Sequence, residues 1–163
     1  METLKNLQEN ATSFSPTPCP YDVYKTSTGY RFITDGGIPY SLSFIQVDPV
    51  YPLYSFSIDR DSDTYHFDNR VKATIMFVLQ NFFKNEYNAM LYTCDITDGR
   101  HYARFRLFNN WYQEYKDIYL REAYCVDDLL STIITRRDNP LAKELQKIFF
   151  DLQNTIVEAS NES

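Results

Sequence analysis

Charged side chains of both signs gather in the middle of the sequence, where they could bind an anionic group. Asp95 and Asp98 lead into Arg100, and Arg104 and Arg106 follow in an expected helix. Arginines near a helix start can hold an anionic ligand or a partner's acidic segment, because they add to the field of the free backbone amides. A structural network is the simpler interpretation, in which Asp98 caps the helix and the arginines pair with neighbouring carboxylates.

Histidine is the other residue type with catalytic potential, since it can exchange a proton near neutral pH. The chain holds two, His66 and His101. His101 stands next to Arg100 and could act as a base, but no nucleophile accompanies it, so we expect a structural role. No Cys-His or His-His pair has metal-ligand spacing, and the Gly-x-Ser-x-Gly turn is absent. We therefore assign no catalytic residue, metal or cofactor.

A run of aspartates precedes the first expected helix but does not form a calcium loop. The EF-hand loop requires glycine at its sixth position and glutamate at its twelfth, and both are missing here. The interpretation is a solvated acidic loop, which contains Asp59, Asp61, Asp63 and Asp68.

The charge balance limits the kinds of partner. The 163 residues carry a net charge of −6, with a pI of about 4.9, whereas nucleic-acid binders present a basic surface to phosphates. Hydrophobic residues make up 44% and aromatic residues 17% of the chain, enough to bury a core and to exclude disorder. We expect a folded protein that does not bind nucleic acid.

The three cysteines, Cys19, Cys94 and Cys125, are odd in number and far apart. This pattern is neither a disulfide framework nor a CxxC metal site, so we expect buried free thiols in a reducing compartment. The N-terminus lacks the apolar segment of a signal peptide, and no apolar run reaches the roughly 18 residues that cross a membrane. These features predict a cytoplasmic protein without membrane contact.

Residues 1–20 are polar and contain three prolines, which favours a flexible arm. We predict one α+β domain over 21–158 and a frayed tail over 159–163. Strands are expected at 30–34, 38–47, 54–58, 89–94, 118–126 and 129–136, and helices at 69–85, at 100–115 and from Asn139–Pro140 onward.

Changes of periodicity support these elements. Tyr40, Leu42 and Phe44 alternate with serines, as in a strand with one buried face. The period then becomes helical behind Asp68, which we expect to cap the helix. Residues 129–136 fit either state, and we choose a strand because 132–135 are all β-branched.

The expected order, β-β-β-α-β-α-β-β-α, resembles the central part of the GNAT acetyltransferase fold over about residues 30–136. GNAT enzymes begin their first central helix with a Gly-rich turn whose amides hold the pyrophosphate of acetyl-CoA. Residues 68–74 contain no glycine, and only Arg70 and Lys72 could attract a diphosphate there. In the later Asn-x-x-Ala-x-x-x-Tyr signature, Arg100 replaces the asparagine, Ala103 matches, and Leu107 replaces the catalytic tyrosine.

A second resemblance concerns an uncharacterised bacterial family. That family pairs a Tyr-x-Phe-x-Thr strand, here Tyr30 to Thr34, with a Cys-Asp-x-x-Asp-Gly-Arg turn, here 94–100. An Arg-Leu-Phe-x-x-Trp helix follows, here 106–111. The resemblance spans most of the chain and implies no activity.

These observations predict a GNAT-like, non-enzymatic module that acts through protein binding. Phe149 and Phe150 place apolar groups on two sides of the last helix, so a homodimer through this helix or an edge strand is expected, as is another protein partner. The alternative is a divergent acyl-CoA binder or acyltransferase that uses Arg70 and Lys72. A member of a toxin–antitoxin or phage-defence pair is a third possibility.

Overall fold

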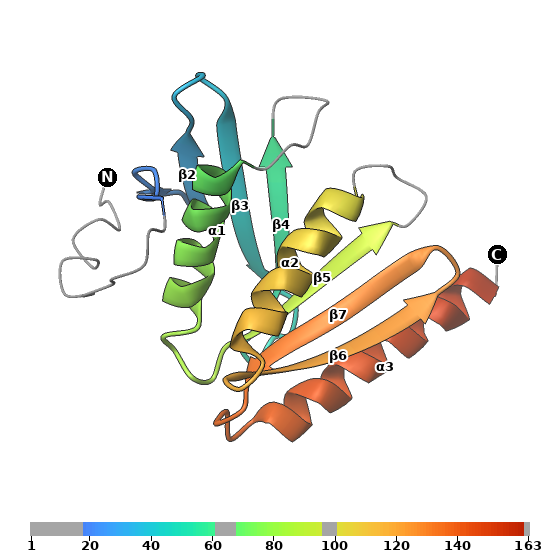
Figure 1. Ribbon diagram of the computed structural model, residues 1–163. Coiled ribbons are helices and arrows are strands. Elements are labelled where there is room, and N and C mark those ends of the chain that lie inside the picture. Colours follow the sequence, from blue (N-terminus) through green and yellow to red (C-terminus); the bar gives the residue numbers. More distant parts are fainter. Residues whose placement is uncertain (1–17, 61–67, 96–100, 162–163) are drawn as a thin grey trace.

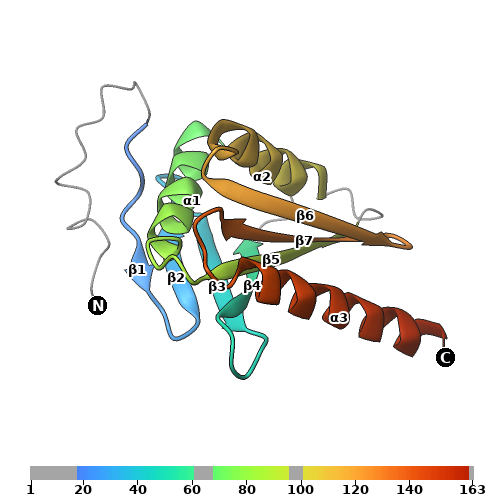
Figure 2. The same ribbon diagram turned by 90° about the horizontal axis from the view of Figure 1, so that it is seen from below.

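One mixed β-sheet forms the centre of the molecule, with helices α1 and α2 on one face and α3 on the other (Figures 1 and 2). The computed structural model describes residues 18–60, 68–95 and 101–161, apart from the side chains at 95, 101–105, 126 and 160. The seven strands follow the order β1-β2-β3-β4-β5-β7-β6. Neighbouring strands are antiparallel except β4 and β5, which run parallel.

The elements confirm the α+β class, and most bounds agree with the sequence pattern. In chain order they are β1 (Tyr24–Lys25), β2 (Gly29–Ile33), β3 (Pro39–Gln46), β4 (Leu53–Arg60), α1 (Asn69–Phe82), β5 (Ala89–Asp95), α2 (His101–Tyr115), β6 (Tyr119–Val126), β7 (Leu129–Arg136) and α3 (Ala142–Asn161). Residues 129–136 form a strand, as their β-branched run predicted. The predicted order lacked β1, a strand of only two residues that shows no alternating pattern.

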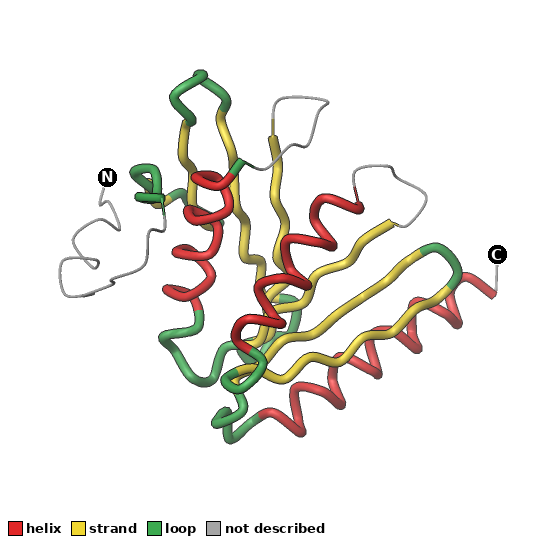
Figure 3. The backbone as a smooth tube through the Cα atoms, in the orientation of Figure 1, coloured by secondary structure: helices red, strands yellow, loops and turns green. Residues whose placement is uncertain are grey.

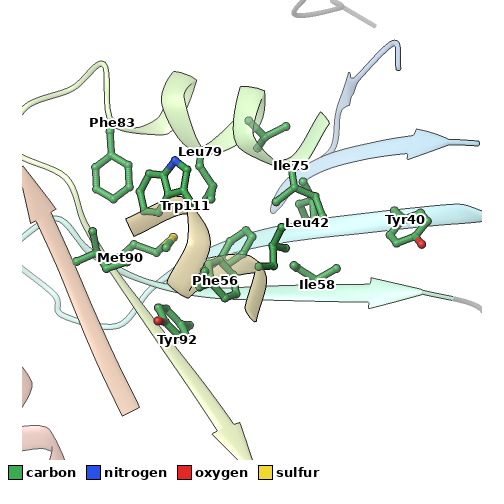
Figure 4. Packing of buried hydrophobic residues seen from close by; sticks show 14 of the residues in the cluster. Tyr40, Leu42, Phe56, Ile58, Ile75, Leu79, Phe83, Met90, Tyr92 and Trp111 are labelled. Atoms are coloured by element: carbon green, nitrogen blue, oxygen red, sulfur yellow. The ribbon is translucent and has the colours of Figure 1, made fainter. Parts of the chain in front are cut away.

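The hydrophobic core lies mainly between the sheet and the two helices α1 and α2. This core includes Tyr40, Leu42 and Ile58 from the strands and Ile75 and Leu79 from α1 (Figure 4). Ser41 and Ser43 alternate with them on the other face. The predicted period of two therefore places the apolar residues on the helix-covered side.

Helix α1 begins at the expected cap. The Asp68 carboxylate accepts a hydrogen bond from the Val71 amide at 2.8 Å. The helix ends at Phe82 rather than at residue 85, because the Asn88 side-chain amide donates to the Phe82 carbonyl at 2.9 Å. A side chain from the following loop thus takes a carbonyl that a longer helix would use.

A second, smaller cluster lies under α3, on the opposite face of the sheet. Leu145 and Phe149 are buried there against Leu53, Leu91 and Ile133. The Asn139 side-chain oxygen accepts the Leu141 amide at 2.9 Å, so the predicted capping residue instead closes a turn and α3 begins only at Ala142. No helix within the described ranges combines the length and apolar character needed to cross a membrane.

The cysteines differ from expectation in one respect. All three are free thiols, but only Cys94 is buried, whereas Cys19 and Cys125 are exposed. Cys94 sits on β5 at an inward position of a central strand, while Cys125 lies near the end of the edge strand β6. Sequence spacing alone does not distinguish these environments.

Candidate functional site

The arginine and aspartate cluster predicted from the sequence lies largely outside the described side chains. Residues 98 and 100 fall outside the described backbone, and the side chains at 95, 101 and 104 outside the described atoms. Arg106 is described and is exposed on α2. The proposed site of Asp95, Asp98, Arg100, His101, Arg104 and Arg106 therefore stays a prediction.

Arg70, the residue assigned to an acyl-CoA turn, makes three contacts within the protein. Its guanidinium pairs with Asp35 at 2.9 Å, donates to the Cys19 carbonyl at 2.9 Å and lies 3.9 Å from the centre of the Tyr21 ring. Lys72, two residues further along α1, is exposed. Arg70 thus fastens the segment before β1 to the first turn of α1 and to the β2–β3 turn.

The N-terminus of α1 is occupied by the chain's own carboxylate. Asp68 accepts the Val71 amide, and its carbonyl accepts the Lys72 amide at 3.0 Å. A bound diphosphate would compete with the Asp68 carboxylate for the Val71 amide and would meet the negative charge of Asp68. The local geometry therefore favours a capped helix over a phosphate site.

Strands β4 and β5 separate soon after they meet. Their parallel pairing covers three residue pairs, from Leu53 with Ala89 to Ser55 with Leu91, although both strands continue beyond it. Figure 3 shows the two strands diverging toward their C-terminal ends. Such a divergence is the feature that could admit a ligand between central strands.

A phenylalanine from α2 fills the divergence. The Phe108 ring stacks on Tyr92 of β5 at 4.4 Å between centroids and meets Phe56 of β4 edge-on at 5.6 Å. Phe108 is 3% exposed. The side chain therefore joins the two diverging strands from the helix side, and the space between them belongs to the core.

Arg60 is a residue that the sequence patterns did not single out. It ends β4, and its guanidinium lies 5.4 Å from the centre of the Tyr40 ring. Its Nε and Nη1 atoms are shielded from solvent and have no acceptor among the described residues. Buried donors of this kind favour an anionic acceptor. The sequence signal that could have indicated Arg60 is its position directly before the acidic loop.

The groups with shifted pKa values belong to the core and to one surface ion pair. Burial raises the pKa of the Tyr92 and Tyr119 hydroxyls above their usual value. A hydrogen bond from Arg136 lowers the pKa of Asp138 and raises that of Arg136 itself. None of these four groups lines either of the two surface hollows described next.

Two hollows flank the β1 side of the sheet. The first, here called the aromatic hollow, holds about 260 Å³ and is lined in part by Lys25, Tyr30, Phe44, Tyr54 and Phe82. Phe44 and Phe82 stack at 4.4 Å, and Tyr54 meets Phe82 edge-on at 5.5 Å. Its rings come from β2, β3, β4 and α1, so only the folded sheet brings them together.

The second hollow, here called the Arg70 hollow, holds about 340 Å³. Tyr21, Tyr24, Ile33, Asp35 and Arg70 form much of its lining. Tyr24 and Ile33 are 37% and 53% exposed, respectively. Both hollows thus include a residue of β1, Lys25 in one and Tyr24 in the other.

The fold defines an α+β protein with a seven-stranded mixed sheet, and no group of three potential metal ligands occurs among its described side chains. The chain belongs to a family of unknown function (DUF6169), whose model matches residues 67–151. The match runs from α1 into α3, so Phe82 lies inside it and the rest of the aromatic hollow's rings lie before it. No curated protein and no solved structure matches the chain.

Proposed function

We propose that the chain is a GNAT-like module without acyltransferase chemistry, which acts by binding another protein or a second copy of itself. The sheet order supports the GNAT-like description, as does helix α1, which connects the parallel strands β4 and β5. The features that would serve an acyl-CoA are altered, since Asp68 caps α1 and Phe108 fills the divergence of β4 and β5.

One observation carries the binding role. The hollows at the β1 end bring partly exposed aromatic and aliphatic side chains to a sheet edge whose outer side pairs with no described strand. Grouped apolar side chains at a surface are typical of interaction sites, whereas scattered ones are not. Exposed Ile45, Val47 and Val50 add apolar surface on the neighbouring β3–β4 hairpin.

Sedimentation velocity over a wide concentration range, combined with affinity capture from the native host, tests this proposal. The expected result is self-association or reproducible enrichment of a partner that survives a salt wash. The bait control is a matched variant, Val50→Asp together with Ile45→Asp, which adds charge to the exposed hairpin. A strict monomer that enriches nothing over an unrelated bait contradicts the binding role.

The second candidate is the acyl-CoA or other phosphate-bearing ligand, and the unmet donors of Arg60 favour it. Calorimetric titration with acetyl-CoA and with CoA separates the two functions. The leading proposal expects no heat and no thermal shift at millimolar ligand. Saturable binding that is lost in Arg60→Gln would establish the second candidate at Arg60, and saturable binding that is lost in Lys72→Gln would establish it at the start of α1.

A further inference from the structure

Strand β1 is one edge of the sheet, and no described strand pairs with its outer side. At the β1–β2 turn, the Thr26 amide donates to the Gly29 carbonyl at 2.9 Å. Hydrogen-bonded and non-hydrogen-bonded pairs alternate along an antiparallel ladder, so the next pair, Lys25 with Tyr30, is not hydrogen-bonded. The backbone amide and carbonyl of Lys25 therefore point away from β2, toward the outer edge of the described sheet.

The side chains of β1 alternate between the two faces. Lys25 shares the face of its paired residue Tyr30, whose hydroxyl accepts a hydrogen bond from Asn81 of α1. Tyr24 points to the opposite face. A segment that pairs with the outer side of β1 would place one side chain beside Lys25 and the next beside Tyr24.

Each of these positions leads to a hollow. Lys25 lines the aromatic hollow, and Tyr24 lines the Arg70 hollow. Adjacent strands lie about 4.8 Å apart, a distance that a large side chain spans. The outward backbone groups of Lys25 and the two hollows therefore present matched contacts to a single extended chain.

We infer that β1 is a docking edge for an extended segment of another protein, which adds to the sheet as an outer strand. The segment has a large aromatic or branched aliphatic side chain opposite Lys25, which enters the aromatic hollow. It has a carboxylate two residues away on the same face, which pairs with the Lys25 ammonium at the rim. Main-chain hydrogen bonds give affinity in such complexes, and alternate side chains give specificity.

Charge distinguishes this partner from a second copy of the chain. Symmetric pairing of two β1 strands about Lys25 would place two ammonium groups directly opposite each other. Like charges at directly opposite positions destabilise a strand pair. An acidic segment from a different protein meets the same position with opposite charge. This inference rests on the proposed binding function and names the chemistry of its partner.

A random peptide display library, selected on the full chain, supplies the probe. Selected peptides are then measured by fluorescence anisotropy against the wild-type chain and three variants. Lys25→Pro removes the outward amide together with the ammonium, and an edge strand tolerates proline where its amide faces solvent, so the variant should fold. Lys25→Gln removes only the charge, and Lys72→Gln removes an exposed charge on α1 as the matched control.

The expected result is a set of peptides with an acidic residue two positions from a large apolar one. Lys25→Pro should weaken their binding at least about fivefold, and more than Lys25→Gln does, because it removes the main-chain hydrogen bond together with the charge. Lys25→Gln should weaken binding about two- to fivefold and reduce its salt dependence, while Lys72→Gln leaves binding unchanged. A thermal unfolding curve for each variant shows that any loss does not come from unfolding.

The inference is overturned if no peptide is enriched, or if Lys25→Pro binds the peptides as tightly as the wild-type chain. Self-association that Lys25→Pro abolishes would assign the edge to a second copy and overturn the inferred partner. A host partner that binds the wild-type chain and Lys25→Pro equally well would leave the proposed function standing while removing β1 as its site.

Discussion

Replacing Phe108 by alanine tests whether α2 closes the divergence of β4 and β5. The ring is 3% exposed and contacts Tyr92 and Phe56 at centroid distances of 4.4 and 5.6 Å. Truncating a buried phenylalanine costs about 3–5 kcal/mol, which combines the lost apolar burial with the cavity left behind. Because small domains are stable by about 5–15 kcal/mol, the variant should fold with a large loss.

Urea unfolding, monitored by the fluorescence of Trp111, measures this loss, since Trp111 lies in the same core cluster. The matched control is Phe150→Ala on α3, where the side chain is 37% exposed and the expected loss is about 1 kcal/mol. Equal losses in the two variants would refute the conclusion that Phe108 fills the divergence of β4 and β5. A Phe108→Leu variant keeps most of the volume and should fall between wild type and alanine.

Three further predictions follow from the core and the surface. Arg70→Ala should lower the free energy of unfolding by about 1–2 kcal/mol, because it removes the exposed ion pair with Asp35 and the contact with the Tyr21 ring. Arg70→Lys should restore little of this loss. A change near zero, measured by urea unfolding, would contradict the conclusion that Arg70 fastens the segment before β1 to α1. Burial raises the pKa of Tyr92, so the unfolded chain ionises first and stability should fall as pH rises above about 10. Urea unfolding of wild type and of Tyr92→Phe at increasing alkaline pH checks this, and an equal fall of stability in the two would count against it. A thiol reagent should modify exposed Cys125 in the native protein and buried Cys94 only after unfolding, and rapid native labelling of Cys94 would show that β5 is open.

The regular elements could be predicted from the sequence because each has a strong local pattern. The helical stripe behind Asp68 and the β-branched run at 132–135 agree with α1 and β7. The lengths of α1 and α3 could not be predicted from the sequence. The Asn88 side chain in the following loop ends α1, and a turn at Asn139 delays the start of α3. Such side-chain contacts arise only in the folded chain.

The candidate site was less accessible to sequence reasoning. Strand β1 has two residues and no alternation, so nothing local marks it, and its pairing with β2 makes it the edge of the described sheet. The aromatic hollow collects rings from elements as distant as Tyr30 and Phe82. The charged residues at 95–106 could be proposed as a site because charge density can be read along a sequence. A surface that strand pairing assembles from distant residues cannot be read in this way.

Hydrogen exchange of the free chain and of the chain saturated with a selected peptide is the most direct test of the central claim. Binding at the β1 edge should slow exchange in residues 21–33, above all at the outward amide of Lys25, and leave the opposite edge strand β6 unchanged. Protection confined to β6, to α3 or to the first turn of α1 would contradict the claim that this protein binds its partner along β1.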